Sequence, residues 1–173
     1  MPHYDYQVPL APHARMGLVS DIDWPLVEPY GWYEVKDGRA TYAYANHEGT
    51  TVKMHRLVLG AALGRPLGPQ EVVDHINGNG IDNRRSNLRL ATHSQNHANA
   101  PKPRTKNPSS QYKGVYWYPY KDGRPRWRAM LRVGDGKRIS LGYFDDEAEA
   151  ARAYDRAHVE HFGEFARPNF PQT

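Results

Sequence analysis

The 173-residue sequence predicts an α+β protein made of two small domains. Segments with the alternating pattern of half-buried strands occur beside segments with the apolar spacing of amphipathic helices. Residues 99–110 divide the chain, because they hold three prolines, two serines and three basic residues and show no apolar periodicity. We therefore predict domains at residues 1–98 and 111–173, joined by a basic, proline-rich linker.

The first domain is expected to begin with a β-hairpin and a helix. Residues 30–35 and 40–45 are rich in strand formers, and the Asp-Gly pair between them is a hairpin signal. A third strand is predicted at residues 50–52. Over residues 53–63 the apolar side chains recur at helical spacing, and Gly64 ends the predicted helix.

Two further strands and a second helix complete the first domain. The strands are predicted at residues 71–73 and 87–91, with a glycine-rich loop between them. The helix begins at Thr92, which forms a capping box with Gln95 that satisfies free backbone N–H groups. This part of the chain is expected to fold as one compact unit.

The second domain is predicted to contain three strands followed by one helix. The strands are expected at residues 112–118, 126–133 and 137–144. Their turns are expected at residues 121–123 and 134–136. The helix is expected at residues 147–162, with Asp146 and Glu149 as its capping pair and Gly163 as its stop.

The charge distribution, the lack of cysteine and the lack of long apolar runs limit the functions that this protein can have. Residues 101–144 carry 11 Lys and Arg against 2 Asp and Glu, which is typical of a surface that binds a polyanion such as nucleic acid. The absence of cysteine excludes disulfides, thiolate nucleophiles and cysteine-ligated zinc, and so favours a hard metal ion. No apolar run approaches the roughly 20 residues that span a bilayer, and no signal-peptide pattern opens the sequence. We expect a cytoplasmic protein with no membrane partner.

Residues 72–96, VVDHINGNGIDNRRSNLRLATHSQN, resemble the HNH nucleases, in particular the ββα-metal group of homing endonucleases. The segment HRLV at residues 55–58 is similar to the one found upstream of this motif in standalone homing enzymes. The resemblance implies a ββα-metal nuclease domain, a DNA substrate, and a bacterial or phage-infected host cell as the setting. It also implies a role for four residues of the motif: Asp74, His75, Asn87 and Asn96.

Phosphodiester hydrolysis gives these roles a physical reason. A water must be deprotonated, which suits an imidazole near neutral pH, and a departing oxygen must be neutralised, which suits a divalent ion. By resemblance, His75 is the general base, and Asn87 belongs to the catalytic set as the residue that fastens the loop and orients His75. Asp74 and Asn96 are the metal ligands, and their oxygens favour Mg²⁺, with Mn²⁺ as the alternative.

Two details bear on this site. Asn96 stands where the name-giving motif has its last His, which makes zinc and nickel less suitable. Asp74 and His75 are adjacent, so both can face one site only where the strand ends or bulges.

Other polar residues around the motif have competing interpretations. His93 and His97 are expected to face solvent or phosphate rather than the metal, and His55 to lie in the core or beside the catalytic residues. Three arginines are predicted to contact phosphate, with an ordinary solvated basic face as the alternative: Arg84, Arg85 and Arg89.

One face of the predicted C-terminal sheet is apolar and the other is basic. Its middle strand alternates Trp127, Ala129, Leu131 and Val133 with Arg126, Arg128, Met130 and Arg132. The same alternation places Arg138 on the basic face and Tyr143 on the apolar one, and it turns Tyr116 and Tyr118 of the first strand towards the basic face. Such a face fits the roughly 12 Å wide major groove of DNA; a merely solvated polar face is the alternative.

Residues 109–171 resemble the plant Apetala-two/ethylene-response-factor (ERF) DNA-binding domain. The motifs that carry this resemblance are YKGV at 112–115, AMLR at 129–132, KRISLGYF at 137–144, EAARAYD at 149–155 and NFP at 169–171. The departures lie on the basic face: Tyr116 and Tyr118 replace Arg, Met130 replaces Glu and Ser140 replaces Trp. The resemblance implies DNA binding without the plant target, and the expected contacts are Lys113, Tyr116, Arg126, Arg128, Arg132 and Arg138.

Together, these features predict a metal-dependent DNA endonuclease of the homing type, anchored on double-stranded DNA by its second domain. The alternative is a non-catalytic DNA-binding transcription regulator that retains the nuclease domain only as a fold. An RNA-binding factor is disfavoured, because the major groove of RNA is too deep and narrow for this sheet. A single active site per chain fits a monomer that nicks DNA, and cutting of both strands by a dimer stays open.

Overall fold

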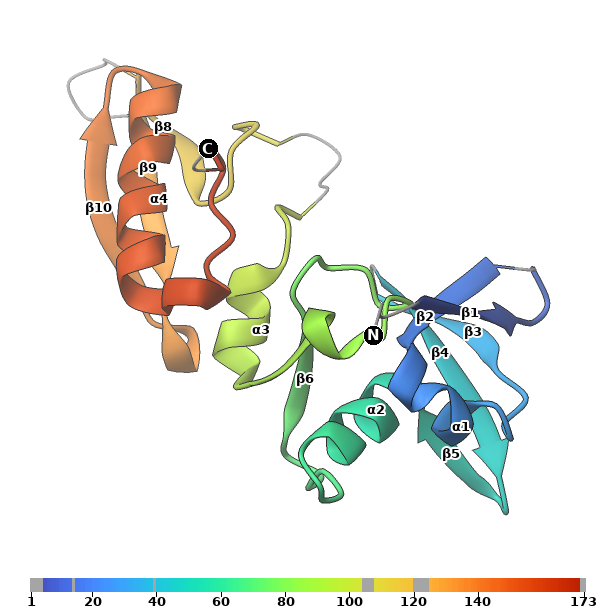
Figure 1. Cartoon of the computed structure of the whole chain (residues 1–173). Coiled ribbons are helices and arrows are strands. Elements are labelled where there is room, and N and C mark those ends of the chain that lie inside the picture. Colours follow the sequence, from blue (N-terminus) through green and yellow to red (C-terminus); the bar gives the residue numbers. More distant parts are fainter. Residues whose placement is uncertain (1–4, 14, 39, 104–107, 120–124, 172–173) are drawn as a thin grey trace. The chain divides into compact units, whose positions relative to one another are not determined.

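A computed structural model describes residues 5–13, 15–38, 40–103, 108–119 and 125–171 (Figure 1). Small antiparallel sheets and helices alternate along the chain, so the predicted α+β class is confirmed. The chain divides into two compact units, Met1–Thr92 and His93–Thr173. Three sets of predicted turn and linker positions lie outside the described residues: Arg39, 104–107 and 121–123.

The first unit opens with a hairpin that the sequence does not predict. Strands β1 (Asp5–Leu10) and β2 (Arg15–Ser20) pair antiparallel and bury Val8, Leu10 and Val19. Pro9 within β1 and Gly17 within β2 weaken the strand signal of both segments. A short 3₁₀ helix, η1 (Asp21–Asp23), and α1 (Trp24–Val27) follow the hairpin.

The predicted hairpin, third strand and helix are all present. Strands β3 (Tyr33–Asp37), β4 (Ala40–His47) and β5 (Thr50–Lys53) form one antiparallel sheet in that order. Helix α2 (Met54–Ala62) follows, and Gly64 adopts φ +68° just beyond its end, as the prediction of a glycine stop requires. The core of this unit joins these elements to the N-terminal hairpin through Leu10, Val19, Val27, Ala43, Ala45, Met54 and Val58.

A long loop then separates two short paired strands. Strands β6 (Val72–His75) and β7 (Leu88–Ala91) are antiparallel, and the 76–87 loop between them ends in a 3₁₀ turn, η2 (Arg85–Asn87). The loop is docked on β2, because the amide of Leu18 donates to the carbonyl of Ile81 over 2.8 Å and the amide of Asn83 donates to the carbonyl of Leu18 over 2.7 Å. The loop is therefore part of the packed structure.

The second unit begins with α3 (His93–Asn99), whereas the sequence predicts that the first domain ends at residue 98. Its sheet contains β8 (Val115–Pro119), β9 (Pro125–Arg132) and β10 (Arg138–Phe144), with β9 in the middle and a 3₁₀ turn, η3 (Gly134–Gly136), before β10. Helix α4 (Glu147–Phe162) packs against this sheet, followed by η4 (Gly163–Phe165). The predicted three strands and helix are thus confirmed.

Two sequence signals set the ends of α4. The carboxylate of Asp146 accepts a hydrogen bond of 2.8 Å from the amide of Glu149, and Gly163 ends the helix with φ +53°. Ala150, Ala151 and Tyr154 are buried on the side of α4 that faces the sheet. The ring of Tyr154 lies so close to Gly114, whose φ is +76°, that no side chain fits at this glycine.

The direction of one side chain differs from the prediction. The register shifts between Ser140 and Gly142, so Tyr143 pairs with Arg128 and lies on the basic face rather than the apolar one. Gly142 adopts φ +124° at this β-bulge, and Phe144 packs into the core instead. Strict alternation along the sequence could not reveal this extra residue.

No helix in the described part of the chain is long and apolar enough to cross a membrane.

Replacing Gly80 in the 76–87 loop with Ala should lower the free energy of unfolding by about 1–3 kcal/mol. The added Cβ would lie 2.5 Å from the carbonyl oxygen of Thr41 and 2.7 Å from the ring of Tyr42. Urea denaturation measures the loss. Gly31→Ala is the matched control, since its Cβ would meet nothing within 4 Å; equal destabilisation by both variants would contradict the packing argument.

Candidate active site

His75 is the last residue of β6, and its imidazole is buried. Its Nε2 lies 3.2 Å from Oδ1 of Asn83, which is fully buried and donates through Nδ2 to the sulfur of Met54. In this arrangement Asn83 presents an acceptor, so Nε2 carries the proton and Nδ1 holds the lone pair. The rings of Tyr42 and His55 lie 5.8 and 5.5 Å from the imidazole between centroids. His75 is thus fixed in one orientation by the loop, β4 and α2.

Burial sets the charge state of both histidines here. Burial lowers the pKa of His75 from its ordinary value, although the hydrogen bond that Nε2 donates to Asn83 and the nearby carboxylates of Asp74 and Asp82 act in the opposite direction. Burial, followed by electrostatic coupling to His75 and the charge of Lys53, lowers the pKa of His55 to about 3. Both imidazoles are therefore neutral at pH 7, and His75 is in the state that accepts a proton.

Asp74 precedes His75 and has a different partner. Its Oδ2 lies 2.8 Å from Nε of Arg89, the residue directly opposite on β7, and both side chains are largely buried. The strand ends at His75, which meets the condition for two adjacent residues to serve one site. A buried carboxylate requires such a counter-charge, so Arg89 has a structural role beside the predicted metal ligand.

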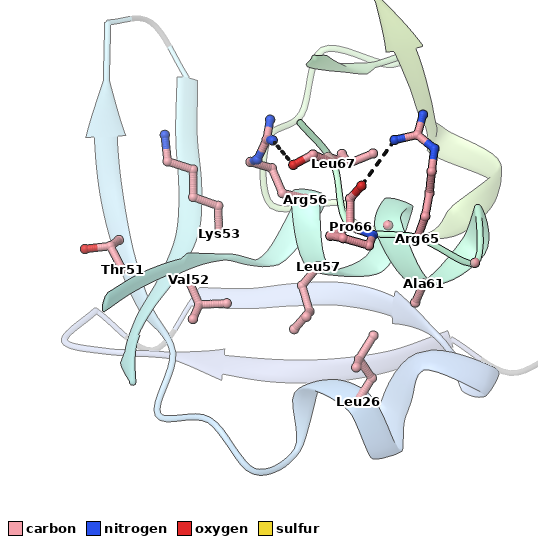
Figure 2. A pocket seen from close by; sticks show the side chains of 12 residues that line it. Leu26, Thr51, Val52, Lys53, Arg56, Leu57, Ala61, Arg65, Pro66 and Leu67 are labelled. Atoms are coloured by element: carbon pink, nitrogen blue, oxygen red, sulfur yellow. Dashed lines mark hydrogen bonds between the residues drawn. The ribbon is translucent and has the colours of Figure 1, made fainter. Parts of the chain in front are cut away.

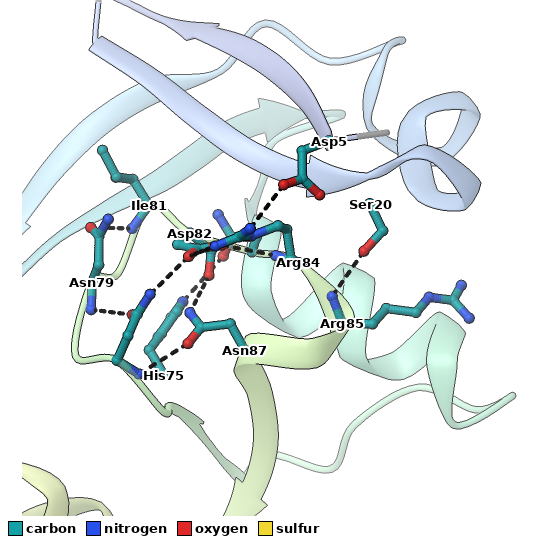
Figure 3. Close-up of polar contacts among 11 residues, drawn as sticks. Asp5, Ser20, His75, Asn79, Ile81, Asp82, Arg84, Arg85 and Asn87 are labelled. Carbon is teal, nitrogen blue, oxygen red and sulfur yellow. Dashed lines mark hydrogen bonds and ion pairs between the residues drawn. The ribbon is translucent and has the colours of Figure 1, made fainter. Parts of the chain in front are cut away.

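Asn87 fastens the base of the 76–87 loop, as the sequence predicts. Its Oδ1 accepts a 3.0 Å hydrogen bond from the amide of Asn77, and its Nδ2 donates over 2.7 Å to the carbonyl of Asp82. The side chain of Asn77 in turn donates over 2.8 Å to the carboxylate of Asp82. These contacts hold both sides of the loop together (Figure 3).

Arg84 and Arg85 face protein carboxylates, which differs from their predicted role at phosphate. Arg84 forms two bonds of 2.8 and 2.7 Å to Asp82 and a third of 2.8 Å to Asp5 (Figure 3). Arg85 forms two bonds of 2.8 and 2.6 Å to Asp23. Asp82 and Asp23 are almost completely buried and need these counter-charges. The two arginines therefore tie the loop to the N-terminal segment.

The remaining predicted residue of the motif, Asn96, lies on α3 in the second unit. It is exposed, and so are His93 and His97 on the same helix. Asp74 and His75 belong to the first unit. The structure thus brings together Asp74, His75 and Asn87 around one hairpin and places Asn96 on a separate element.

Lys113 is directed inward, which differs from its predicted contact with DNA. Its ammonium donates to the carbonyls of Ala98 and Ala100 over 2.6 and 2.8 Å, at the C-terminal end of α3. Burial, followed by the charge of Arg167, lowers its pKa to about 8. Lys113 therefore caps α3, since a cation at a helix C-terminus satisfies its last carbonyls.

The other predicted DNA contacts lie on the basic face of the sheet. Tyr116 is 51 % exposed, and Arg132 and Arg138 are exposed and directly opposite each other on neighbouring strands. Arg126 lies 3.8 Å from the carboxylate of Asp145. Because Asp145 is exposed, solvent screens this ion pair and it is weak. Like charges directly opposite are destabilising unless an anion neutralises them, so Arg132 and Arg138 form a suitable anion site.

The donor set limits which metal the site suits. Among the described residues, no group of three or more His, Cys, Asp or Glu side chains lies close enough to hold a metal ion alone. Mg²⁺ usually takes only one or two carboxylates and completes its shell with waters and substrate phosphates. Asp74 with an amide oxygen fits this pattern, whereas a closed zinc site needs four protein ligands.

A separate hollow beside α2 has no Asp, Glu, His or Cys side chain among the described residues of its lining (Figure 2). Its lining is mostly apolar, with Leu57 and Pro66 among its members. Arg56 donates to the carbonyls of Leu67, Gly68 and Glu71. Arg65 pairs with the carboxylate of Glu71 over 2.7 Å. Arg56 and Arg65 therefore brace the segment between α2 and β6.

The sequence analysis missed Asn83, whose side-chain oxygen lies within hydrogen-bond distance of Nε2 of His75. The one signal was the density of Asn and Asp in the 76–87 loop, since such side chains commonly hydrogen-bond loop backbone. That signal does not distinguish Asn83, which supports the imidazole, from Asn79, which bonds to the loop backbone.

Comparison with known proteins identifies two regions of similarity. A family model described as HNH endonuclease matches residues 52–98. A protein of Acanthamoeba polyphaga mimivirus described as an HNH endonuclease is 33 % identical over 156 residues, which cover 90 % of this chain and 75 % of the viral protein. APETALA2-like protein 2 of Oryza sativa, in both subspecies indica and japonica, is 48 % identical over 63 residues, which cover 36 % of this chain and 14 % of the plant protein. No solved structure matches the chain significantly.

The first unit should lose stability as the pH falls from 7 to 5. The unfolded chain binds a proton at His55 near pH 6.5, whereas the folded protein, with a pKa of about 3, does not. The unfolded state therefore binds more protons over this interval, and each pH unit below 6.5 costs about 1.4 kcal/mol at most. Hydrogen exchange of the β4 and α2 amides measures this loss.

His55→Gln should reduce that pH dependence, and His161→Gln, on the exposed end of α4, serves as the control. Equal slopes for His55→Gln and the parent protein would contradict a buried, neutral His55.

Proposed function

Since the chain belongs to the HNH endonuclease family, we propose that it hydrolyses double-stranded DNA with His75 as its general base and with a divalent metal ion. The observation that carries this proposal is the state of His75. Its imidazole is buried, neutral at pH 7 and held through Nε2 by Asn83, beside the carboxylate of Asp74. A neutral imidazole of fixed orientation is suited to take a proton from water.

The proton accepted from the attacking water goes to Nδ1 of His75. Nε2 keeps its own proton, because it faces the carbonyl oxygen of the Asn83 amide over 3.2 Å. The same oxygen stabilises the ring once it is protonated, as do the nearby charges of Asp74 and Asp82. Asn87 acts as a positioning residue: by closing the 76–87 loop it keeps Asn83 and His75 in register.

Asp74 and Asn96 are the proposed metal ligands, with Mg²⁺ favoured and Mn²⁺ as the alternative. When bound, the metal ion neutralises charge on the phosphate and on the departing oxygen. Arg89 holds the carboxylate of Asp74 in place through Oδ2. HNH nucleases in general use divalent metal ions, and this donor set is compatible with that use.

We further propose that the C-terminal sheet anchors the enzyme on DNA. Supporting this, the exposed side chains Tyr116, Arg132 and Arg138 share one face. Part of an APETALA2-like protein is also similar to this segment. A sheet face of this kind enters the major groove. A monomer with one site would nick DNA, and two copies would cut both strands.

A non-catalytic DNA-binding regulator is the second candidate. It would share the basic face but would not need a histidine kept neutral by burial and held by an amide. Buried polar networks cost stability unless every member is satisfied. The hydrogen bonds around His75 thus favour the enzyme.

His75→Ala should reduce cleavage by at least about a hundredfold, the usual contribution of a general base. The assay follows conversion of supercoiled plasmid to open-circle or linear product, with Mg²⁺ and with EDTA. DNA binding should stay near that of the parent protein, and His161→Ala should cut normally. Normal cutting by His75→Ala would show that another group is the base, and full activity in EDTA would exclude a metal role.

Loss of the two opposed arginines should flatten the salt dependence of DNA binding. Each phosphate contact contributes about 0.9 to the slope of log affinity against log salt concentration. The Arg132→Ala and Arg138→Ala double variant should therefore lose up to twice that value, measured by fluorescence anisotropy with duplex DNA. The Arg152→Ala and Arg156→Ala double variant, on the exposed side of α4, removes the same number of charges and is the control. A slope unchanged by the double variant would show that this face is only solvated.

A further inference from the structure

We propose that Arg128, held by the rings of Tyr118 and Tyr143, reads a guanine in the major groove, while Arg132 and Arg138 contact phosphate. This inference rests on the proposed binding of DNA by the C-terminal sheet and divides its basic face into two functions. Tyr118 and Tyr143 act as positioning residues for the guanidinium group, one from β8 and the other from β10.

The geometry around Arg128 sets it apart from the other arginines. Its guanidinium carbon lies 5.6 Å from the ring centroid of Tyr118 and 5.5 Å from that of Tyr143. The two rings are themselves 5.4 Å apart and inclined by 53°. Both distances are within the range of a cation–π interaction, so the cation rests in a notch formed by the two rings.

The partners of Arg128 are aromatic rather than acidic. Arg84, Arg85 and Arg89 each form short ion pairs with carboxylates, and Arg126 has Asp145 nearby. Within the described ranges, no carboxylate pairs with Arg128, and its buried Nε has no hydrogen-bond partner. Stacking on rings fixes the plane of a guanidinium without using its N–H donors. Arg128 is therefore held in place and still has donors for a ligand.

A fixed plane matters for a base and much less for a phosphate. The pairing of Arg with the O6 and N7 atoms of guanine needs two parallel N–H donors in the plane of the base. A phosphate accepts hydrogen bonds from many directions, which suits the exposed Arg132 and Arg138. Ordering the side chain before binding also removes part of the entropy cost of forming a bidentate contact.

The β-bulge places Tyr143 beside Arg128 and so forms this notch. Without the register shift between Ser140 and Gly142, Tyr143 would lie on the apolar face, away from Arg128. The positive φ of Gly142 allows the strand to turn its next side chain to the basic face. The bulge and the two rings thus act together to position the guanidinium group of Arg128.

The test measures base preference in full-length protein carrying His75→Ala, so that DNA stays uncut. Binding to a randomised duplex library, read by sequencing, gives the preference at each position. Arg128→Lys keeps the charge and loses the planar fork, and Tyr143→Leu removes the ring. Each should reduce the preference for guanine at one and the same position by about 5- to 150-fold. Tyr143→Phe keeps a ring face and should retain the preference.

A second probe identifies the atom that is read. Replacing that guanine with 7-deazaguanine removes the N7 acceptor and should weaken binding of the parent protein but not of Arg128→Lys. Base preferences unchanged in Arg128→Lys, with duplex binding retained, would overturn the guanine site alone. If the Arg132→Ala and Arg138→Ala double variant also leaves the salt slope unchanged, the proposed anchor fails as well.

Discussion

The buried carboxylate of Asp82 is the interaction on which the first unit depends. Burial alone would raise its pKa, but the hydrogen bonds from Arg84 and Asn77 and the charge of Arg84 lower it, so Asp82 is ionised inside the protein. An unpaired charge at this position would cost several kcal/mol. Arg84 must therefore stay in contact, and through Asp5 it also holds the N-terminal hairpin. The loop that supports His75 is thus organised by charge as much as by apolar packing.

Regular elements with a clear period could be predicted from the sequence. Helix α2 has apolar residues at helical spacing before Gly64, and α4 has a capping residue and a glycine stop, so their bounds follow from local signals. The β1–β2 hairpin lacks such signals, because Pro9 and Gly17 interrupt it and its stability comes from packing against distant elements. The bulge in β10 is likewise a tertiary effect, set by the fit between Phe144 and the core.

The candidate site was only partly predictable. The resemblance to HNH nucleases identified Asp74, His75 and Asn87, because their chemistry is encoded within one short segment. The partners of the arginines were not predictable, since Asp23 and Asp5 lie 62 and 79 residues away along the chain. The prediction of phosphate contacts therefore missed the partners of three arginines: Arg84, Arg85 and Arg89 are engaged by buried or nearby carboxylates. The predicted DNA contact of Lys113 also overlooked partners within the protein, because its ammonium group donates to backbone carbonyls.

The bulge in β10 also affects which genetic changes this protein can tolerate. Substitution at position 143 alters a side chain on the outer face and leaves the core intact. Insertion of one residue between Tyr143 and Phe144 would do something different: it would move Phe144 out of the apolar layer that it now shares with Trp127. Deletion of Leu141, the extra residue of the bulge, would instead leave Tyr143 opposite Arg128 and Phe144 opposite Trp127. Diversification of this surface among relatives is therefore expected to proceed by amino-acid replacement and by loss of the bulge rather than by insertion after it.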